Sequence, residues 1–201
     1  MSHQPTQSGL LFILSGPAGS GKTTICDALI KTESIARIIT STTRKPRSQE
    51  VDGVDYHFLT HADFQEKIDQ GCFFEYATVH NHFYGTQKAA IIEPLMQGQN
   101  LLLNIDVQGA KTIAQKAEKD PYLNGKVVTV FIKPPNIEEL EKRLLHRATD
   151  SVEEIKRRLE VAKKEIEQQA FYHHVIISGS KEDDLKSVCK IYQDETALRK
   201  P

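Results

Sequence analysis

Residues 10–24 read LLFILSGPAGSGKTT, and this stretch decides the fold of the chain. Five apolar residues in a row, Leu10 to Leu14, are typical of a buried strand in a parallel sheet. Residues 16–23 then match the pattern G-x-x-x-x-G-K-[ST], and an amphipathic helix is expected from Thr23 to Lys31. A strand, this glycine-rich turn and a helix in direct succession predict a P-loop, which holds the phosphates of a nucleotide.

Each residue type in this turn has a physical role at a phosphate site. Glycines let the backbone fold around a polyphosphate with its N–H groups pointing inward, and the helix N-terminus adds positive potential. We expect Lys22 to reach the β- and γ-phosphates and the Thr23 hydroxyl to ligate Mg²⁺. An ordinary glycine-rich turn is the alternative. The predicted ATP-binding residues are Gly16, Pro17, Ala18, Gly19, Ser20, Gly21, Lys22, Thr23 and Thr24.

Further apolar runs alternate with helical patterns along most of the chain. Strands are expected near 35–39, 101–105, 127–132 and 175–177, and helices near 93–97, 110–117, 137–145, 152–170 and 183–198. Buried strands that alternate with amphipathic helices predict an α/β fold, with a central parallel sheet between helical layers. Two stretches depart from this rhythm: a polar one at 42–86, expected to hold short strands around a helix at 62–70, and a charged one at 138–164. We interpret both as excursions from the sheet, because neither has enough apolar residues for a core of its own.

The composition excludes several classes of protein. The 201 residues are 39% hydrophobic, and 26 Lys and Arg stand against 27 Asp and Glu, for a net charge of −1. Such a chain is expected to fold, and it lacks the basic surplus of a protein that binds duplex nucleic acid. The three cysteines show no C-x-x-C spacing, and no apolar run is long enough to span a membrane. We therefore predict a cytoplasmic protein with neither a nucleic acid nor a membrane as partner.

Asp106 directly follows the apolar run Leu101 to Ile105. In P-loop proteins a second strand brings an Asp beside the metal site. An Asp at the end of a strand is also a common helix cap, here ahead of a helix that starts near Gln108. Both roles stay open from the sequence alone.

A second anion site is indicated by Arg44 and Arg47, which stand three residues apart with Pro46 between them. Guanidinium groups bind phosphate oxygens in bidentate fashion, and tyrosine hydroxyls can donate further hydrogen bonds. Tyr56 and Tyr84 could therefore join the two arginines around one terminal phosphate. A solvated basic loop is the alternative.

A series of motifs in fixed order resembles the guanylate kinase family, nucleoside monophosphate kinases that phosphorylate GMP with ATP. After the P-loop come STTRKPR (41–47), VDGVDYHF (51–58), FE (74–75), YGT (84–86), NIDVQG (104–109) and RLLHRATDS (143–151). The resemblance runs from about Leu10 to the last helix. It implies a single domain at 8–199, with a core (8–40, 88–136 and 165–199), a GMP-binding region (41–87) and a helical lid (137–164).

The resemblance also implies roles for individual residues. Glu75 falls where the family reads guanine, whose N1–H and exocyclic amine one carboxylate can accept together. Without the resemblance, Glu75 would be taken as an exposed strand carboxylate. The implied GMP-binding residues are Thr40, Ser41, Arg44, Arg47, Tyr56, Glu75, Tyr84, Gly85, Thr86, Asp106 and Arg158. The implied catalytic residues are Lys22, Arg44, Arg143 and Arg147, and the implied metal ligand is Thr23.

The chain departs from the family pattern at several positions. Asn104 stands where the family generally has an acidic residue, and Ser178-Gly179 stands where an Asn-Asp pair is typical near the adenine site. Ala148 and Asp150 replace a usual Gly and Glu. Asn104 brings a Mg²⁺ role for this position into question. Ser178-Gly179 does the same for the contacts to adenine.

The expected reaction is phosphate transfer from ATP to GMP, and also to dGMP, with Mg²⁺ bound to ATP. The acceptor phosphate has a second pKa near 6 and needs no general base, so positioning and charge neutralisation carry the catalysis. We expect both excursions to close over the substrates. The alternatives are a kinase of the same scaffold with another acceptor, such as ribose bisphosphate, and a non-catalytic phosphopeptide-binding module. Whether the chain is a monomer or a homo-oligomer is undecided at this level.

Overall fold

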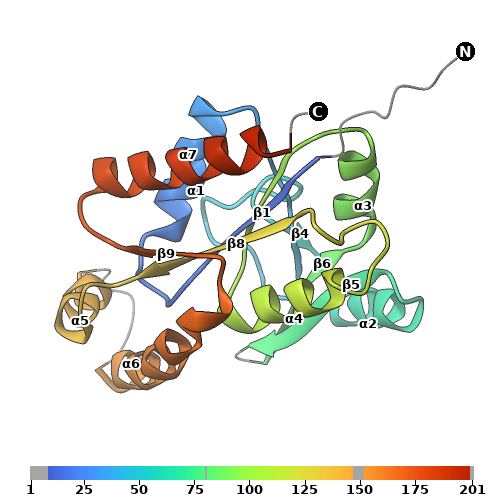
Figure 1. The fold of residues 1–201 in the computed structure, drawn as a ribbon. Coiled ribbons are helices and arrows are strands. Elements are labelled where there is room, and N and C mark those ends of the chain that lie inside the picture. Colours follow the sequence, from blue (N-terminus) through green and yellow to red (C-terminus); the bar gives the residue numbers. More distant parts are fainter. Residues whose placement is uncertain (1–8, 80, 147–151, 200–201) are drawn as a thin grey trace, which may run out of the picture.

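A parallel sheet of five strands forms the centre of the molecule in the computed structural model, which describes residues 9–79, 81–146 and 152–199 (Figure 1). The strand order is β2-β7-β1-β8-β9, and every neighbouring pair is parallel. The strands are β1 (Leu11–Ser15), β2 (Ala36–Arg37), β7 (Leu101–Asn104), β8 (Val127–Lys133) and β9 (His174–Ile177). Because β1 lies in the middle of the sheet, the loop that follows it opens at the centre of the carboxyl edge, where ligands bind in such folds.

Helices cover both faces of this sheet, so the core has three layers. On one face, Leu11 and Ile13 of β1 pack with α3 (Ala89–Met96), α4 (Val107–Ala117) and the 3₁₀ turn Gln168–Phe171. On the other face, Phe12 and Leu14 pack against α1 (Lys22–Thr32) and α7 (Lys181–Ala197). Successive side chains of a strand point to opposite faces, so a continuously apolar strand is what a sheet covered on both sides requires. The predicted α/β fold is confirmed.

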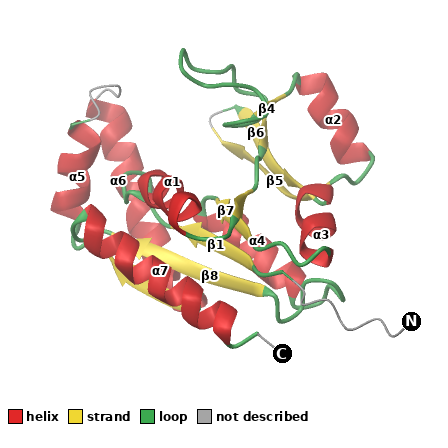
Figure 2. Ribbon diagram, turned by 90° about the horizontal axis from the view of Figure 1, so that it is seen from above, coloured by secondary structure: helices red, strands yellow, loops and turns green. Residues whose placement is uncertain are grey.

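The polar stretch forms a second, smaller sheet beside the core (Figure 2). Its order is β4 (His57–Phe58), β3 (Ser41–Thr42), β6 (His82–Gln87) and β5 (Phe73–Val79). The helix α2 (His61–Asp69) packs on it through Phe64, whose ring stacks on that of Phe73 at 4.3 Å between centroids. The expectation of short strands around one helix is confirmed, and pairing between β3 and β6 joins them into a sheet.

The charged stretch forms two packed helices, α5 (Ile137–Leu145) and α6 (Val152–Glu167). Contrary to the expectation that this excursion has no core, the pair buries a small apolar cluster of its own. Its members are Leu140, Leu144, Ile155, Leu159 and Ala162. These residues recur at spacings of three to four, so each helix presents one apolar stripe to the other. Arg147 lies outside the described residues.

Some element boundaries differ from those expected. The helix α3 begins at Ala89 instead of residue 93, because the buried Ile91 places an extra turn against the core. The strand β2 has two residues, and the last residues of the long helix expected at 152–170 form a 3₁₀ turn. None of the described helices is both long and apolar enough to cross a membrane.

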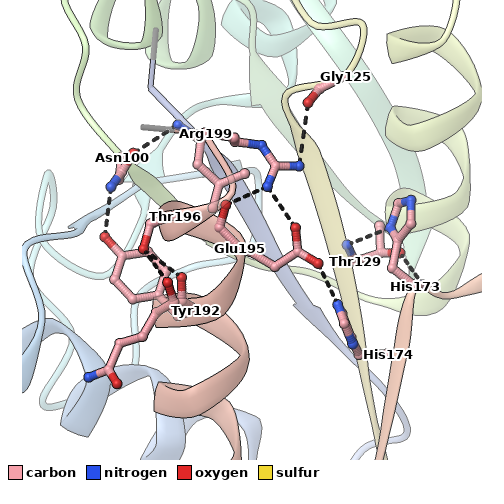
Figure 3. Close-up of polar contacts among 11 residues, drawn as sticks. Asn100, Gly125, Thr129, His173, His174, Tyr192, Glu195, Thr196 and Arg199 are labelled. Carbon is pink, nitrogen blue, oxygen red and sulfur yellow. Dashed lines mark hydrogen bonds and ion pairs between the residues drawn. The ribbon is translucent and has the colours of Figure 1, made fainter. Parts of the chain in front are cut away.

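Polar contacts fasten the last helix to the sheet (Figure 3). The Asn100 side chain accepts a hydrogen bond from the Leu10 amide (2.9 Å) and donates one to the Tyr192 hydroxyl (2.8 Å). Nearer the C-terminus, Glu195 contacts the His174 imidazole of β9 and the Arg199 guanidinium at 2.7 and 2.6 Å. These contacts hold α7 along the face where it covers β1 and β8.

Candidate active site

The loop between β1 and α1 is closely surrounded by its neighbours. Gly16 has a φ of 144°, and a Cβ placed there would lie 2.3 Å from the Ile132 carbonyl oxygen of β8. Gly19 has a φ of 91°, and a Cβ there would lie 3.1 and 3.2 Å from the side chains of Leu140 and Leu144 in α5. Only glycine fits these conformations and spaces. The pattern of glycines therefore reflects both the backbone conformation and the packing of α5 against the loop.

The Lys22 side chain folds back onto the backbone of the loop between β1 and α1. Lys22 Nζ donates hydrogen bonds to the carbonyl oxygens of Gly16 (2.7 Å) and Pro17 (2.9 Å). The helix α1 starts at Lys22, and its N-cap is Gly21, which offers no capping side chain. The first N–H groups of α1 therefore form an N-terminal end suited to an anion. Thr23 and Thr24 are exposed in this first turn.

The end of β7 lies beside the first turn of α1. Asn104 Nδ2 lies 3.4 Å from Thr23 Oγ1, so the amide faces the hydroxyl that we expect to bind a metal. Asp106 caps α4, because its Oδ1 accepts a hydrogen bond from the Gly109 amide at 2.9 Å. The capping role that the sequence left open is therefore present, and a second role at the metal stays a prediction.

Arg44 lies in an aromatic pocket on the second sheet. Its Cζ is 5.6 Å from the centre of the Tyr56 ring, and the Tyr56 and Tyr84 rings are 6.2 Å apart. Its Nη2 donates to Glu50 Oε1 at 2.9 Å. The structure thus brings together Arg44, Tyr56 and Tyr84, three of the four residues expected to hold a phosphate.

Glu50 connects the fourth residue to this group. Its Oε2 accepts a hydrogen bond from the Arg47 amide at 2.8 Å, and its Oε1 lies 3.7 Å from the Arg47 guanidinium, which is 75% exposed. The hydrogen bond from Arg44 lowers the pKa of Glu50. The sequence reasoning missed Glu50. A single acid three residues after Arg47, in an otherwise basic segment, was the available signal.

Glu75 is buried, with 5% of its surface exposed, where β5 and β6 meet the first turn of α4. Its Oε1 accepts a hydrogen bond from Thr86 Oγ1 at 2.7 Å, and a Cβ at Gly109 would lie 3.3 Å from its Oε2. Burial raises the pKa of Glu75 to about 7, and the Thr86 hydrogen bond opposes this shift. A buried carboxylate with a raised pKa is a candidate for binding hydrogen-bond donors of a ligand.

Other predicted GMP residues lie on or next to β3 and β6 of the second sheet. Ser41 of β3 is buried, pairs with Gly85 of β6 and accepts a hydrogen bond from Gln87 Nε2 at 2.9 Å. Thr40 precedes β3, and its carbonyl oxygen accepts the His57 amide at 2.8 Å. One small sheet therefore carries or adjoins both the residue expected to read the base and the residues expected to bind the phosphate.

The family model described as guanylate kinase matches residues 8–195. The chain belongs to the guanylate kinase family. A guanylate kinase of Rickettsia felis is 42% identical over 184 residues, which are 91% of this chain and 92% of the relative. A guanylate kinase of Clostridioides difficile is 40% identical over 190 residues, which are 94% of this chain and 89% of the relative. The crystal structure of guanylate kinase from Anaplasma phagocytophilum aligns with a TM-score of 0.76 at 28% identity, and covers 94% of this chain and 87% of that one.

Membership in the guanylate kinase family confirms several predictions at once. The chain is an enzyme, a P-loop kinase that phosphorylates GMP with ATP, and the resemblance seen in the sequence was correct. This reading is favoured over a kinase for another acceptor and over a phosphopeptide-binding module. The roles of individual residues stay predictions that rest on the geometry described here.

Two of the arginines to which the family resemblance gives a role lie on the helices α5 and α6. Arg143 of α5 donates from Nη1 to Ser178 Oγ at 2.9 Å and from Nε to Glu139 at 3.1 Å. Arg158 of α6 forms an ion pair with Glu154 of the same helix at 3.0 Å. In Figures 1 and 2, α6 lies well apart from β4 and β6, so a contact of Arg158 with GMP stays a prediction.

Proposed function

We propose that this chain transfers the γ-phosphate of ATP to GMP, giving ADP and GDP, with the P-loop as the ATP site and the second sheet as the GMP site. The observation that carries the proposal is the burial of Glu75 on the sheet that also holds the Arg44 pocket. A base reader and a phosphate clamp on one sheet suit a nucleoside monophosphate. We expect dGMP to be accepted as well, because no residue of the predicted set is assigned to the 2′-hydroxyl.

The guanine base is selected by Glu75. A carboxylate accepts two hydrogen bonds side by side, which matches the N1–H and the exocyclic amine of guanine. Adenine lacks this pair of donors, so AMP would leave the buried carboxylate unsatisfied, at about 1–3 kcal/mol. The hydroxyls of Ser41 and Thr86, on β3 and β6 of the same sheet, are expected to serve the O6 or N7 atom of the same base.

The GMP phosphate is bound by Arg44, Arg47, Tyr56 and Tyr84, in competition with Glu50. Arg44 already sits in its pocket before the ligand arrives, so little side-chain entropy is lost on binding. The acceptor phosphate, with a second pKa near 6, is largely a dianion at neutral pH and is itself the nucleophile. The chain therefore needs no general base, and its task is to bring two polyanions together.

Lys22 and Arg143 supply positive charge to the group in transfer, together with Arg147. Thr23 would hold Mg²⁺ as one oxygen ligand, and an exposed hydroxyl at the start of α1 fits a hard cation. The Asn104 amide, 3.4 Å away, leaves that hydroxyl with a neutral neighbour instead of an acidic one. Bound Mg²⁺ would neutralise charge on the phosphates of ATP.

A coupled assay of ADP release tests the proposal. GMP and dGMP should be rapid acceptors, and AMP and ribose 1,5-bisphosphate should be slow. Faster turnover with ribose 1,5-bisphosphate than with GMP would overturn the acceptor assignment. Failure to bind ATP in a calorimetric titration would overturn the catalytic reading altogether.

The wider setting of the enzyme follows from the same proposal. Cys26, Cys72 and Cys189 carry free thiols, which suits a reducing compartment, so the cytoplasmic location stays our prediction. The division into core, GMP-binding region and lid also stays a prediction, as does closure of both excursions over the substrates. Limited proteolysis with and without both nucleotides would test the closure.

A further inference from the structure

We propose that Ser178 and Asp184 are positioning residues that hold the Arg143 guanidinium ready for the phosphate in transfer. The proposal rests on the proposed function, because it assigns these two residues to the same reaction. Neither residue is among the predicted catalytic or binding residues, and the contacts among the three residues carry the argument.

A continuous chain of hydrogen bonds joins the three side chains. Arg143 Nη1 donates to Ser178 Oγ at 2.9 Å, and Ser178 Oγ donates to Asp184 Oδ2 at 2.7 Å. A guanidinium can only donate and a carboxylate can only accept, so the direction of both bonds is fixed. The Asp184 carboxylate therefore polarises the Ser178 hydroxyl, whose oxygen becomes a better acceptor for Arg143.

Ser178 and Asp184, at one end of this series of hydrogen bonds, are buried and held by further hydrogen bonds. Ser178 and Asp184 are 3% and 5% exposed. The second carboxylate oxygen of Asp184 accepts the Gly179 amide at 2.7 Å, and the Ser178 amide donates to the Lys133 carbonyl at the end of β8, also at 2.7 Å. Asp184 itself lies in the first turn of α7. Ser178 and Asp184 are thus held by the end of β8 and by α7, while Arg143 belongs to α5.

At the Arg143 end of this series, the Nη2 group is left for a ligand. Arg143 uses Nε for Glu139 and Nη1 for Ser178, and Nη2 makes no hydrogen bond to any residue within 9–79, 81–146 and 152–199. The helix α5 also packs on the P-loop, because Leu140 and Leu144 border Gly19. An arginine that is already held in place on this helix does not have to be ordered when ATP arrives.

The experiment compares Ser178→Ala with a matched control at Ser180, two residues further along the same loop. Ser178→Ala should lower kcat about 5- to 20-fold and leave the KM for GMP unchanged, because the lost order affects charge stabilisation and not GMP binding. Ser178→Thr keeps the hydroxyl and should restore most of the activity. Ser180 caps α7 and has an exposed hydroxyl that contacts Asp183. Ser180→Ala should therefore lower the Tm and leave kcat unchanged.

A double-mutant cycle decides whether Ser178 acts through Arg143. In an Arg143→Ala background, Ser178→Ala should change kcat less than twofold. Full additivity of the two substitutions would overturn the proposal, as would equal kcat values for Ser178→Ala, Ser180→Ala and the unmodified enzyme.

A readout without substrate separates this proposal from the proposed function. ¹⁵N NMR of the Arg143 Nε–H group should show faster exchange with solvent in Ser178→Ala and no change in Ser180→Ala. If the unmodified enzyme fails to phosphorylate GMP, the proposed function fails. If Arg143 exchange is the same in both variants, the positioning role fails.

Discussion

Glu75→Gln tests the assignment of the guanine reader. An amide oxygen can accept one guanine donor, but the NH₂ group then faces the second donor. The loss combines a hydrogen bond to a charged group, about 1.5–3 kcal/mol, with an unsatisfied buried donor, about 1–3 kcal/mol. We therefore expect kcat/KM for GMP to fall about 10²- to 10³-fold, and the preference for GMP over AMP to shrink with it. Glu66→Gln, at an exposed site on α2 of the same region, is the matched control and should leave both unchanged.

The raised pKa of Glu75 adds a pH dependence with a defined sign. With a pKa of about 7 in the free protein, roughly a tenth of Glu75 is ionised at pH 6 and about nine-tenths at pH 8. Only the ionised form accepts both donors, so the KM for GMP should be about tenfold higher at pH 6 than at pH 8. The GMP phosphate also titrates near pH 6 and adds its own pH dependence to the KM. The Glu75→Gln variant keeps the part from the phosphate and lacks the part from Glu75, so the difference isolates Glu75.

The same shift predicts an opposite effect on stability. Glu75 has its raised pKa only in the folded protein, so the unfolded chain releases its proton first. The free energy of unfolding therefore falls as the pH rises from 4.5, and this decrease is complete above pH 7. The shift corresponds to a loss on the order of 3 kcal/mol. Glu75→Gln should recover part of this at pH 8, as measured by urea unfolding without ligand. Equal pH slopes of KM in the enzyme and the variant, together with an unshifted urea midpoint, would refute the reasoning.

Three further substitutions test other parts of the structure. Lys22→Ala should reduce kcat by about 10²-fold or more, because positive charge on the group in transfer is lost; near-normal turnover would remove the P-loop from the mechanism. Asn104→Asp should lower the Mg²⁺ concentration for half-maximal activity about 3- to 10-fold, since it puts a carboxylate beside Thr23; an unchanged Mg²⁺ titration would argue against a metal there. Asn100→Ala removes the bonds to Leu10 and Tyr192 and should lower the free energy of unfolding by about 2 kcal/mol, with kcat unchanged; a urea midpoint equal to that of the unmodified enzyme would contradict this.

Local patterns predicted the elements that depend on neighbouring residues. The helix α5 spans Ile137–Leu145, the bounds expected from its apolar spacing, and the strand, loop and helix at residues 10–31 were correctly placed. Backbone preference and side-chain periodicity act within a few residues, so the sequence carries them directly. The P-loop is the clearest case, because the whole cradle consists of eight consecutive residues.

The sequence did not predict which residues that are distant along the chain come into contact. The sequence presented Glu75 as a strand carboxylate that could be exposed, but the first turn of α4 and Thr86 of β6 bury it and raise its pKa. Glu50 is seen as a partner of Arg44 only in the structure, where the loop places it against that guanidinium. Desolvation depends on everything that surrounds a group in space, and sequence neighbours supply little of that environment.

The residues of this chain therefore indicate on their own a phosphate cradle and a pair of arginines, and the family resemblance adds Glu75 as the carboxylate expected to bind guanine. The tertiary structure alone decided how these groups are charged, oriented and held. Arg143 and Ser178 are 35 residues apart, and Asn100 and Tyr192 are 92 apart, yet both pairs are joined by hydrogen bonds. A hydrogen bond depends on distance and angle in space, which only the packing of helices against the sheet sets.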